Sequence, residues 1–497
     1  MNNAFWIALF GQMLMGAFDT IYHHEVTERL AWRPGQAGEL RLHGVRNLAY
    51  ATLFGVLGWS EPRGAWAIAL LALLGGELVI TLWDFVEEDR TRKLPATERV
   101  THTLLTLNYG VILAMLVPWL ADRTSEPTML APAFHGWMSY FCAVAALGVI
   151  VSGLRDLAAA RRCPRLVRED AAALADALTG RKAILVTGGT GFVGLRLVAA
   201  LAGAGHAVTV LTRDRAKAAA LVGTGEVRIV TTVGEIAADE HLDAIVNLAG
   251  EPISDSPWTH AKRLRIVRSR LTVTRDVLRL IARLERKPEV LVSGSAIGWY
   301  GLRGDQILTE ANLGTPCFSR RVCVAWERAA AKAQAHGVRT VLLRTGLVLA
   351  SEGGMLARTL APFEFGLGGR FGNGRHWMSW IHRDDLVRLI VHAVATQSLA
   401  GPVNGTAPGP VTNRDFTAAL GRALGRPALV PIPAWPLRLL LGAFAEELLL
   451  SGQRVLPEAA MRSGFVYRYA TIDEALCAIT GRQPRNAAPA RFAHVEA

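Results

Sequence analysis

The stretch Ala183-Ile-Leu-Val-Thr187-Gly188-Gly-Thr-Gly191-Phe-Val-Gly194 decides the fold of the second half of this 497-residue chain. Its first five residues are mostly apolar and β-branched, which is typical of a buried strand. A glycine-rich turn follows directly, and residues 195–204 then have the composition of a helix. Glycines between a strand and a helix let the backbone approach a pyrophosphate, which binds the N–H groups at the helix N-terminus. This context predicts a dinucleotide-binding turn.

Further strand-like segments follow at 206–212, 227–232, 244–247 and 290–293. Their alternation with helical stretches predicts an α/β fold, a Rossmann-type doubly wound parallel sheet. Ligands of such sheets bind at the carboxyl ends of the strands. The segments Asn247-Leu-Ala-Gly250 and Ser293-Gly-Ser-Ala296 are predicted to lie at two of these ends.

The end of the second strand indicates which dinucleotide binds. An acidic residue there usually holds the ribose 2′-hydroxyl of NAD, whereas a cation accommodates the 2′-phosphate of NADP. Arg213 immediately follows the strand, with Arg215 and Lys217 close behind. This pattern favours NADP(H). Asp214 leaves NAD open as the alternative.

The composition indicates that a second, different part precedes this domain. Hydrophobic residues make up 51% of the chain and charged residues 19%, with a formal net charge of +12 and a mean hydropathy of +0.26. These values exclude a disordered chain and argue against an entirely soluble one. The five cysteines form no CxxC pair. This pattern argues against a disulfide framework and a cysteine-based zinc site, and it fits a reducing compartment.

Five apolar stretches lie before residue 160, at about 5–22, 45–59, 65–85, 104–120 and 137–157. A helix needs roughly 20 residues to cross the hydrocarbon of a bilayer. The third and fifth stretches meet this length easily, and the second is the shortest. The first stretch has no basic residue ahead of it, which argues against a removable signal peptide. We expect residues 1–160 to form an all-α, five-helix transmembrane domain.

Basic residues between these stretches predict the topology. Thirteen of them lie in the two alternate loops and after the last stretch, whereas the other two loops carry only Arg63 and Arg123. The thirteen are Arg29, Arg33, Arg41, Arg46, Arg90, Arg92, Lys93, Arg99, Arg155, Arg161, Arg162, Arg165 and Arg168. By the positive-inside rule the N-terminus lies outside and the second half is cytoplasmic, at the inner membrane. The alternative is a soluble bundle of five helices.

Histidines and carboxylates gather at the predicted inner ends of these spans. Spacings of three, four and seven place them on common helix faces, so they are expected to meet in one layer. Such groups converging from several helices are typical of iron or manganese sites. The predicted metal-binding residues are Asp19, His23, His24, His43, Glu77, Asp84 and His102. Pairing of the carboxylates with the arginine-rich loops is the alternative interpretation.

Longer motifs in the second half resemble the extended short-chain dehydrogenase/reductase superfamily. Within it, the chain is similar to the sugar-nucleotide-epimerase-like epimerase family proteins, of the NAD-dependent epimerase/dehydratase type, which have their own C-terminal domain. The resemblance covers about residues 182–482 and leaves out the membrane part. It is carried by 186–194, 247–250, Ser269-Arg270, 295–301, Trp326-Glu327, 344–346, 366–369, 377–382 with Asp385, 401–404 and 454–457.

The resemblance implies a catalytic Tyr-x-x-x-Lys pair, which this chain lacks. In that pair the lysine lowers the pKa of the tyrosine, which acts as general acid and base. None of the seven tyrosines is followed by lysine four residues later, and the expected region reads Cys317-Phe-Ser-Arg-Arg-Val-Cys-Val-Ala-Trp-Glu327. Ser295 matches the catalytic serine of the superfamily. Tyr300 is a substitute proton donor by proximity, or a structural residue beneath the nicotinamide.

The motifs also assign ligand-binding residues. Those expected to bind the cofactor are Gly188, Gly189, Thr190, Gly191, Phe192, Val193, Gly194, Arg213, Asn247, Ala249, Gly250 and Arg344. Those expected to bind the substrate are Arg370, Arg375, His376, Trp377, Trp380 and His382. Two arginines in the glycine-rich loop 365–375 suit an anionic substrate or phosphate. A solvated turn with tryptophans packed at a domain interface is the alternative.

Together these patterns predict a transmembrane domain (1–160), a basic connecting segment (161–181), an NADP-binding Rossmann domain (182–400) and a small C-terminal substrate domain (401–497). We expect a membrane-anchored, NADP(H)-binding oxidoreductase or epimerase-like enzyme acting on a small molecule. One alternative is a non-catalytic NADP(H) sensor that regulates the membrane domain. Another is a membrane metal-redox domain supplied with electrons by the NADPH-binding domain. No nucleic-acid-binding motif accompanies the basic charge, so nucleic acid is not an expected partner.

Overall fold

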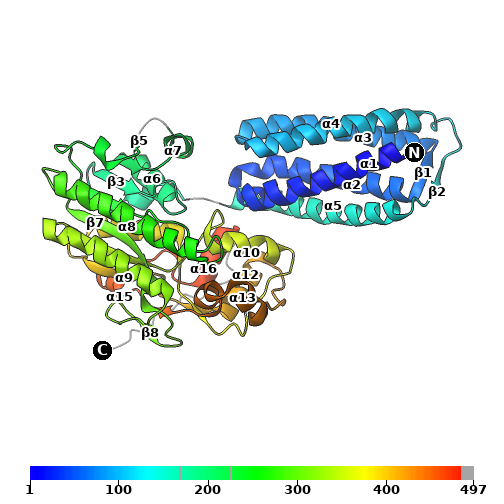
Figure 1. The fold of residues 1–497 in the computed structure, drawn as a ribbon. Helices are drawn as coiled ribbons and strands as arrows, with labels where there is room; N and C mark the ends of the chain where they lie inside the picture. The colour runs from blue at the N-terminus through cyan, green and yellow to red at the C-terminus, as the bar shows by residue number, and fades with distance from the viewer. Residues whose placement is uncertain (167–168, 224–226, 483–497) are drawn as a thin grey trace. The chain divides into compact units, whose positions relative to one another are not determined.

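A computed structural model describes residues 1–166, 169–223 and 227–482 of the chain. The chain divides into two compact units, residues 1–167 and 168–497, and each is described by itself (Figure 1). Arg168, one of the thirteen basic residues above, lies outside the described residues. Residues 483–497 of the predicted C-terminal domain do so as well.

The first unit is a bundle of five long helices. They are α1 (Asn3–Phe18), α2 (Ala37–Trp59), α3 (Ala65–Thr91), α4 (Ala96–Ala121) and α5 (Trp137–Arg162). A π-helical segment, Asp19–Thr27, continues α1. At the other end of the bundle, β1 (Ser60–Arg63) pairs antiparallel with β2 (Met129–Pro132).

Four helical segments are long and apolar enough to cross a membrane: Asn3–Trp32, Ala65–Thr91, Ala96–Ala121 and Trp137–Arg165. Only 22–28% of the residues in their most apolar windows are buried, so many of their apolar side chains face outward. The predicted span 45–59 lies in α2, which does not meet these criteria. This helix begins at Ala37 and carries Glu39, His43 and Arg46 in its first half. The structure therefore supports four of the five predicted spans by length and composition.

Glycines bring α2 and α5 close together. A Cβ atom at Gly44 would lie 2.6 Å from Leu157 Cγ, and one at Gly58 would lie 2.6 Å from Cys142 Cβ. Small residues at such contacts let helix backbones approach closely, which is common between helices packed in membranes.

The second unit is built on a seven-stranded parallel sheet. Its strands are β3 (Ala183–Thr187), β4 (Ala207–Leu211), β5 (Val227–Val230), β6 (Ala244–Asn247), β7 (Val290–Ala296), β9 (Arg339–Thr345) and β13 (Gly401–Gly405). Across the sheet the order is β5-β4-β3-β6-β7-β9-β13, so β6 is central and β3 lies beside it. This doubly wound order confirms the predicted Rossmann-type fold.

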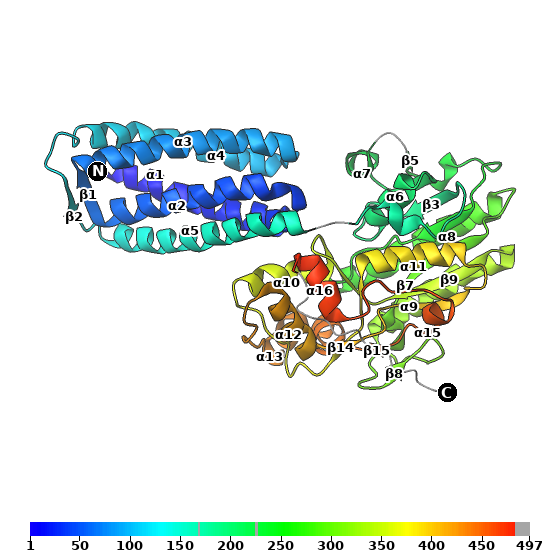
Figure 2. The same ribbon diagram turned by 180° about the vertical axis from the view of Figure 1, so that it is seen from behind.

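Helices cover both faces of the sheet because its strands are apolar on both sides. On one face lie α6 (Gly194–Gly203) and α11 (Arg383–Ala395) (Figure 2). Leu197 of α6 and Leu386 of α11 belong to the same buried cluster as Val186. On the other, α8 (His260–Arg283) and α9 (Phe318–Ala330) are in front in Figure 1. There Ile281 packs with Leu185. α7 (Arg215–Val222) connects β4 to β5.

The other elements of this unit are short. They are β8 (Ile307–Leu308), β10 (Leu347–Leu349), α10 (Gly354–Glu364), β11 (Trp377–Met378), β12 (Trp380–His382), β14 (Val411–Thr412), α12 (Asn413–Leu424), α13 (Ala434–Leu441), α14 (Ala443–Ala445), β15 (Arg454–Val455), α15 (Glu458–Arg462) and α16 (Ile472–Thr480). Strand β13 follows the predicted domain boundary at 400, yet it pairs with β9 along its whole length. The structure thus places residues 401–405 in the sheet, because this strand completes its edge.

Candidate active site

The predicted dinucleotide-binding turn connects β3 to α6. Gly188 has a φ of +71°, and Gly191 N–H donates to its carbonyl at 2.9 Å. A Cβ atom at Gly194 would lie 2.1 Å from the same carbonyl oxygen. Only glycine fits at both positions, because L-residues rarely adopt such a φ and no side-chain atom fits so near the backbone. A compact glycine turn before a helix N-terminus is a common binding site for a phosphate.

The residues after β4 separate into two roles. Asp214 caps the N-terminus of α7, where its side chain accepts a hydrogen bond from Lys217 N–H at 2.9 Å. Arg215 forms an ion pair with Glu235 at 2.6 Å. Arg213 is exposed at the strand end. Asp214 thus caps its own helix, and Arg213 lies two residues after β4, the strand whose end binds the ribose in this fold.

A buried hydrogen-bond chain fixes the end of β6. Thr187 Oγ1 donates to Asn247 Oδ1 at 2.7 Å and accepts from Ala249 N–H at 3.2 Å. Asn247 Nδ2 donates to Thr274 Oγ1 at 3.0 Å. Gly250 lies against Arg270, whose guanidinium carbon would be 3.1 Å from a Cβ atom there. The predicted cofactor residues Asn247, Ala249 and Gly250 therefore lie beside the glycine turn, on the neighbouring strand.

Glu327 links the ends of β7 and β9. It accepts a hydrogen bond from Ser295 Oγ at 2.6 Å. Arg344 donates to both of its carboxylate oxygens, from Nε at 2.9 Å and from Nη2 at 3.0 Å. All three side chains are buried. Arg344, which was expected to contact the cofactor, thus binds Glu327. The motif Trp326-Glu327 contains this carboxylate, but the sequence did not predict its role.

Tyr300 lies beside this group and is fully buried. Its hydroxyl donates to Asn404 Oδ1 at 2.7 Å and accepts from Arg344 Nη1 at 3.2 Å. Burial raises the pKa of the phenol above its usual value. In this structure the hydroxyl connects β13 to Arg344.

Cys323 and Glu327 are four residues apart on α9, the same spacing as in a Tyr-x-x-x-Lys pair. The Cys323 thiol donates to the Ala296 carbonyl at 3.5 Å. Burial raises its pKa to about 11, so the thiol keeps its proton at neutral pH. The expected catalytic region therefore presents a neutral thiol and a carboxylate held by arginine, next to Ser295.

The residues expected to bind substrate fall into two sets. Arg370 and Arg375 are exposed in the glycine-rich loop, and His376 is half-buried, with its pKa lowered to about 4 by burial. Trp377 is also half-buried and donates from Nε1 to Asp305 at 2.7 Å. Trp380 and His382 are buried. Trp380 Nε1 donates to the Gly409 carbonyl, and His382 Nδ1 accepts from Asp384 N–H at the start of α11.

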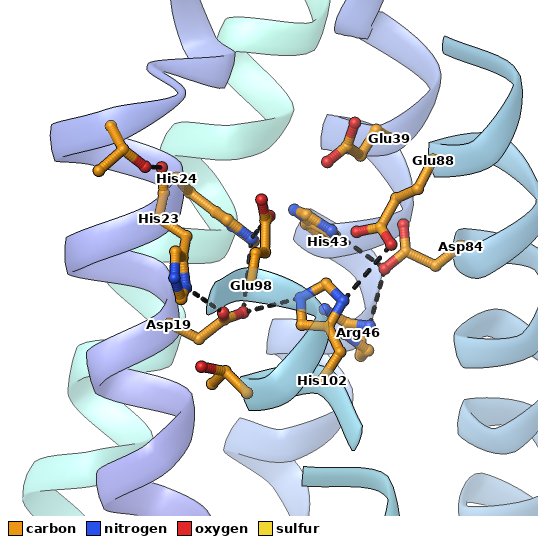
Figure 3. Close-up of polar contacts among 12 residues, drawn as sticks. Asp19, His23, His24, Glu39, His43, Arg46, Asp84, Glu88, Glu98 and His102 are labelled. Atoms are coloured by element: carbon orange, nitrogen blue, oxygen red, sulfur yellow. Dashed lines mark hydrogen bonds and ion pairs between the residues drawn. The ribbon is translucent and has the colours of Figure 1, made fainter. Parts of the chain in front are cut away.

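Most of the residues expected to bind metal meet at one end of the helical bundle (Figure 3). Asp19 contacts His23 at 2.8 Å and His102 at 3.2 Å. Asp84 contacts His43 at 3.0 Å. Glu77 is engaged elsewhere, as it accepts from Tyr50 at 2.6 Å and from Thr81 at 2.8 Å. Glu39, which sequence reasoning missed although it precedes His43 by four residues, belongs to the cluster.

The sheet order and the glycine turn define a Rossmann-type nucleotide-binding protein. The model of the NAD dependent epimerase/dehydratase family matches residues 184–404, and a domain of unknown function, DUF1731, matches residues 432–479. The epimerase family protein ML0860 of Mycobacterium leprae is 39% identical over 62% of this chain and 100% of its own length. This chain belongs to the NAD dependent epimerase/dehydratase family, as the sequence motifs predicted.

Two further relatives cover the same share of the chain. The chloroplastic SDR39U1 homolog of Arabidopsis thaliana is 40% identical over 60% of this chain and 86% of its own length. The crystal structure of human epimerase family protein SDR39U1 (isoform 2) with NADPH is 31% identical, with a TM-score of 0.54. It covers 60% of this chain and 98% of its own. Family membership makes the second unit an NAD(P)-binding domain. Both family models match residues within this unit.

Proposed function

We propose that the chain is a membrane-anchored, NADP(H)-binding oxidoreductase or epimerase-like enzyme that acts on a small anionic molecule. The preference for NADP(H) over NAD(H) rests on two residues shortly after β4, Arg213 and Asp214. Asp214 is engaged as a helix cap, and Arg213 is exposed beside it. The human relative's structure was determined with NADPH, which agrees with this choice.

The chemistry rests on what the chain's own residues provide. The glycine turn and the N-terminus of α6 would hold the pyrophosphate, and Arg213 the 2′-phosphate. A bound nicotinamide would supply hydride transfer. Ser295 and the protonated thiol of Cys323 are the proton-bearing groups at the end of β7, and Arg344 binds the carboxylate of Glu327 next to them. Arg370 and Arg375 provide positive charge for an anionic substrate.

Membrane anchoring is supported by the four long apolar helices and by the distribution of basic residues. In this proposal the N-terminus lies outside, and the second unit faces the cytoplasm. The apolar surface of the first unit would be covered by lipid.

Calorimetric titration of the full-length chain in detergent tests the cofactor. NADPH should bind more tightly than NADH. Arg213→Ala should weaken NADPH binding about 10- to 100-fold, because a charge-assisted hydrogen bond contributes about 1.5–3 kcal/mol, and should leave NADH unchanged. Arg215→Ala is the matched control, since that arginine is paired with Glu235. Equal binding of the two cofactors would contradict the proposal.

A non-catalytic NADP(H) sensor is the second candidate, and one observation favours it. The hydroxyls of Ser295 and Tyr300 both donate within the protein, to Glu327 and Asn404. A sensor would bind NADPH with the same dependence on Arg213, yet it would oxidise none. Substrate-dependent loss of NADPH absorbance in a screen of small phosphorylated and carboxylated carbonyl compounds would eliminate this candidate.

A further inference from the structure

The first unit concentrates ionisable side chains at one end of its bundle (Figure 3). Four helical segments each contribute two residues spaced four apart, which places each pair on one helix face. The pairs are Asp19 and His23, Glu39 and His43, Asp84 and Glu88, and Glu98 and His102. His24 joins them from the π-helical segment. Its ring stacks on that of His43, with centroids 4.6 Å apart.

Within this cluster, the side chains of Asp19, His24 and His102 form a compact group. One ligand atom from each lies within 4.8 Å of the other two. Asp19 Oδ2 is 3.2 Å from His102 Nε2 and 3.5 Å from His24 Nε2. Two imidazoles and one carboxylate are the donor set of the facial triad that binds iron in many proteins.

The cluster holds more carboxylates than guanidinium groups. Its five carboxylates face two guanidinium groups and four imidazoles. Arg46 pairs with Asp84, and Arg92 pairs with Glu39, Glu88 and Glu98. The imidazoles of His23, His24 and His102 contact Asp19, and that of His43 contacts Asp84. Within the described residues, no other arginine or lysine forms an ion pair with these carboxylates. Each carboxylate is at least nine-tenths buried. Buried carboxylates need positive charge nearby, and a cation bound among the imidazoles would supply it.

Several buried polar atoms also lack a hydrogen bond. His24 Nε2, Asp84 Oδ1 and Glu88 Oε1 have no hydrogen bond within the described residues. All three side chains are at least nine-tenths buried, and Figure 3 shows them pointing into the cluster. Such atoms are rare in folded proteins unless a ligand or ion satisfies them.

We propose that Asp19, His24 and His102 bind one divalent transition-metal ion, iron(II) or manganese(II). Glu88 and Glu98 lie next to the ion site, 3.5 Å from His102 Nδ1 and 3.7 Å from His24 Nε2. His23 positions Asp19 through its 2.8 Å contact, as outer residues commonly do for metal ligands. His43 and Asp84 are held by each other, with Arg46 also on Asp84, and Glu77 by Tyr50, so none of these three is a ligand in this assignment.

The ion site adjoins a pocket of about 790 Å³ between α3 and α4, whose wall includes Glu88 and His102. Arg90, Lys93 and Arg99 give this pocket positive charge, and Phe85 and Leu107 give it apolar surface. A small molecule with an anionic group and an apolar body would therefore reach the ion from this side.

The test uses the full-length chain purified in detergent. After chelation, the protein is titrated anaerobically with iron(II) and, separately, with manganese(II), and bound metal is measured by elemental analysis and manganese electron paramagnetic resonance. We expect about one equivalent of metal per chain. Asp19→Asn and His24→Ala should abolish binding, and His23→Ala should weaken it about 10- to 100-fold.

Matched controls separate ligand loss from misfolding. His135→Ala changes a histidine in the loop before α5 and should bind metal like the wild type. NADPH affinity, measured in every variant, reports on the second unit alone. A failure of the cofactor proposal can therefore be told apart from a failure of the metal proposal. Asp19→Asn is nearly isosteric and should elute as the wild type does. A monodisperse wild-type chain that binds neither metal, or a His24→Ala variant that binds as tightly as wild type, would overturn the proposal.

Discussion

Glu327 joins two neighbouring strands at the carboxyl end of the sheet. It accepts from Ser295 on β7 and from Arg344 on β9, and all three are buried. Breaking a buried ion pair leaves one charge without compensation, which costs more than the pair contributes. The effect of Glu327 on stability is therefore expected to be large, whatever its part in chemistry.

Glu327→Gln should lower the free energy of unfolding by about 3–5 kcal/mol, because Arg344 is left buried and unpaired. Urea denaturation followed by fluorescence measures the change. The double variant with Arg344→Met should recover part of the loss. Glu446→Gln, which breaks the exposed pair with Arg438, is the control and should cost at most about 1 kcal/mol.

His382 makes stability depend on pH. Burial lowers its pKa to about 4, and its Nδ1 accepts from Asp384 N–H only while the ring is neutral. The unfolded chain, with an ordinary pKa near 6.5, binds the proton more readily. The stabilisation is therefore complete above about pH 6.5 and is lost as the pH falls toward 4.

His382→Asn removes the titration and keeps a side-chain acceptor at the helix start. The difference in unfolding free energy between wild type and variant should fall by about 2 kcal/mol from about pH 7 to about pH 5. Denaturation curves at the two pH values measure it. Parallel pH profiles for the two proteins would show that folding does not lower the pKa of His382.

At the scale of elements, the turn between β3 and α6 is so compact that backbone atoms leave no room for a side chain at Gly194. A methyl group at Gly194 would collide with the carbonyl of Gly188, whereas at Gly203, on the same helix, the nearest atom would be 3.5 Å away. The two glycines therefore differ in what a substitution does to the turn.

Gly194→Ala should weaken NADPH binding roughly 5- to 150-fold, since relieving an overpacked contact costs about 1–3 kcal/mol. Gly203→Ala should leave affinity unchanged, because that glycine is far from the turn along α6. Titration calorimetry on both variants measures this. Equal effects at the two positions would mean that helix stability, rather than turn geometry, controls the affinity.

Local pattern explains which elements were predictable from sequence. The strand from Ala183 to Thr187 and the glycine turn after it are specified by adjacent residues, and both lie where they were expected. The Ser295–Glu327–Arg344 group joins three elements distant in sequence, so spacing along the chain could not reveal it. Strand β13 was assigned to another domain, because its residues Gly401–Gly405 carry little strand signal and their partner β9 lies far upstream.

At the scale of the whole molecule, the chain joins two units with different surfaces. The long helices of the first unit expose side chains such as Ile7, Val79 and Val144. The second unit has a smaller apolar surface around α13, with Trp435 and Leu439 exposed. The relatives that the chain matches have about the length of the second unit alone.

A fragment comprising residues 168–497 should therefore fold and bind NADPH with the affinity of the full chain. In alkaline carbonate, which strips peripheral proteins from membranes, the fragment should be released while the full chain stays in the pellet. Release of the full chain would contradict membrane spanning. Retention of the fragment would mean that the surface around α13 inserts into lipid.

The strand order also bears on how the protein is made. The helical bundle is synthesised before β3, an inner strand of the sheet, and of the seven strands in this sheet the edge strand β13 is the last to emerge. At 5–20 residues per second, the ribosome takes roughly 10 to 45 seconds to pass from β3 to β13. The glycine turn, Arg213 and the end of β6, which are predicted to hold most of the dinucleotide, are complete by Gly250, well before β9 and β13 exist. Cofactor binding is thus available to stabilise the nascent domain while the far edge of its sheet is still unmade.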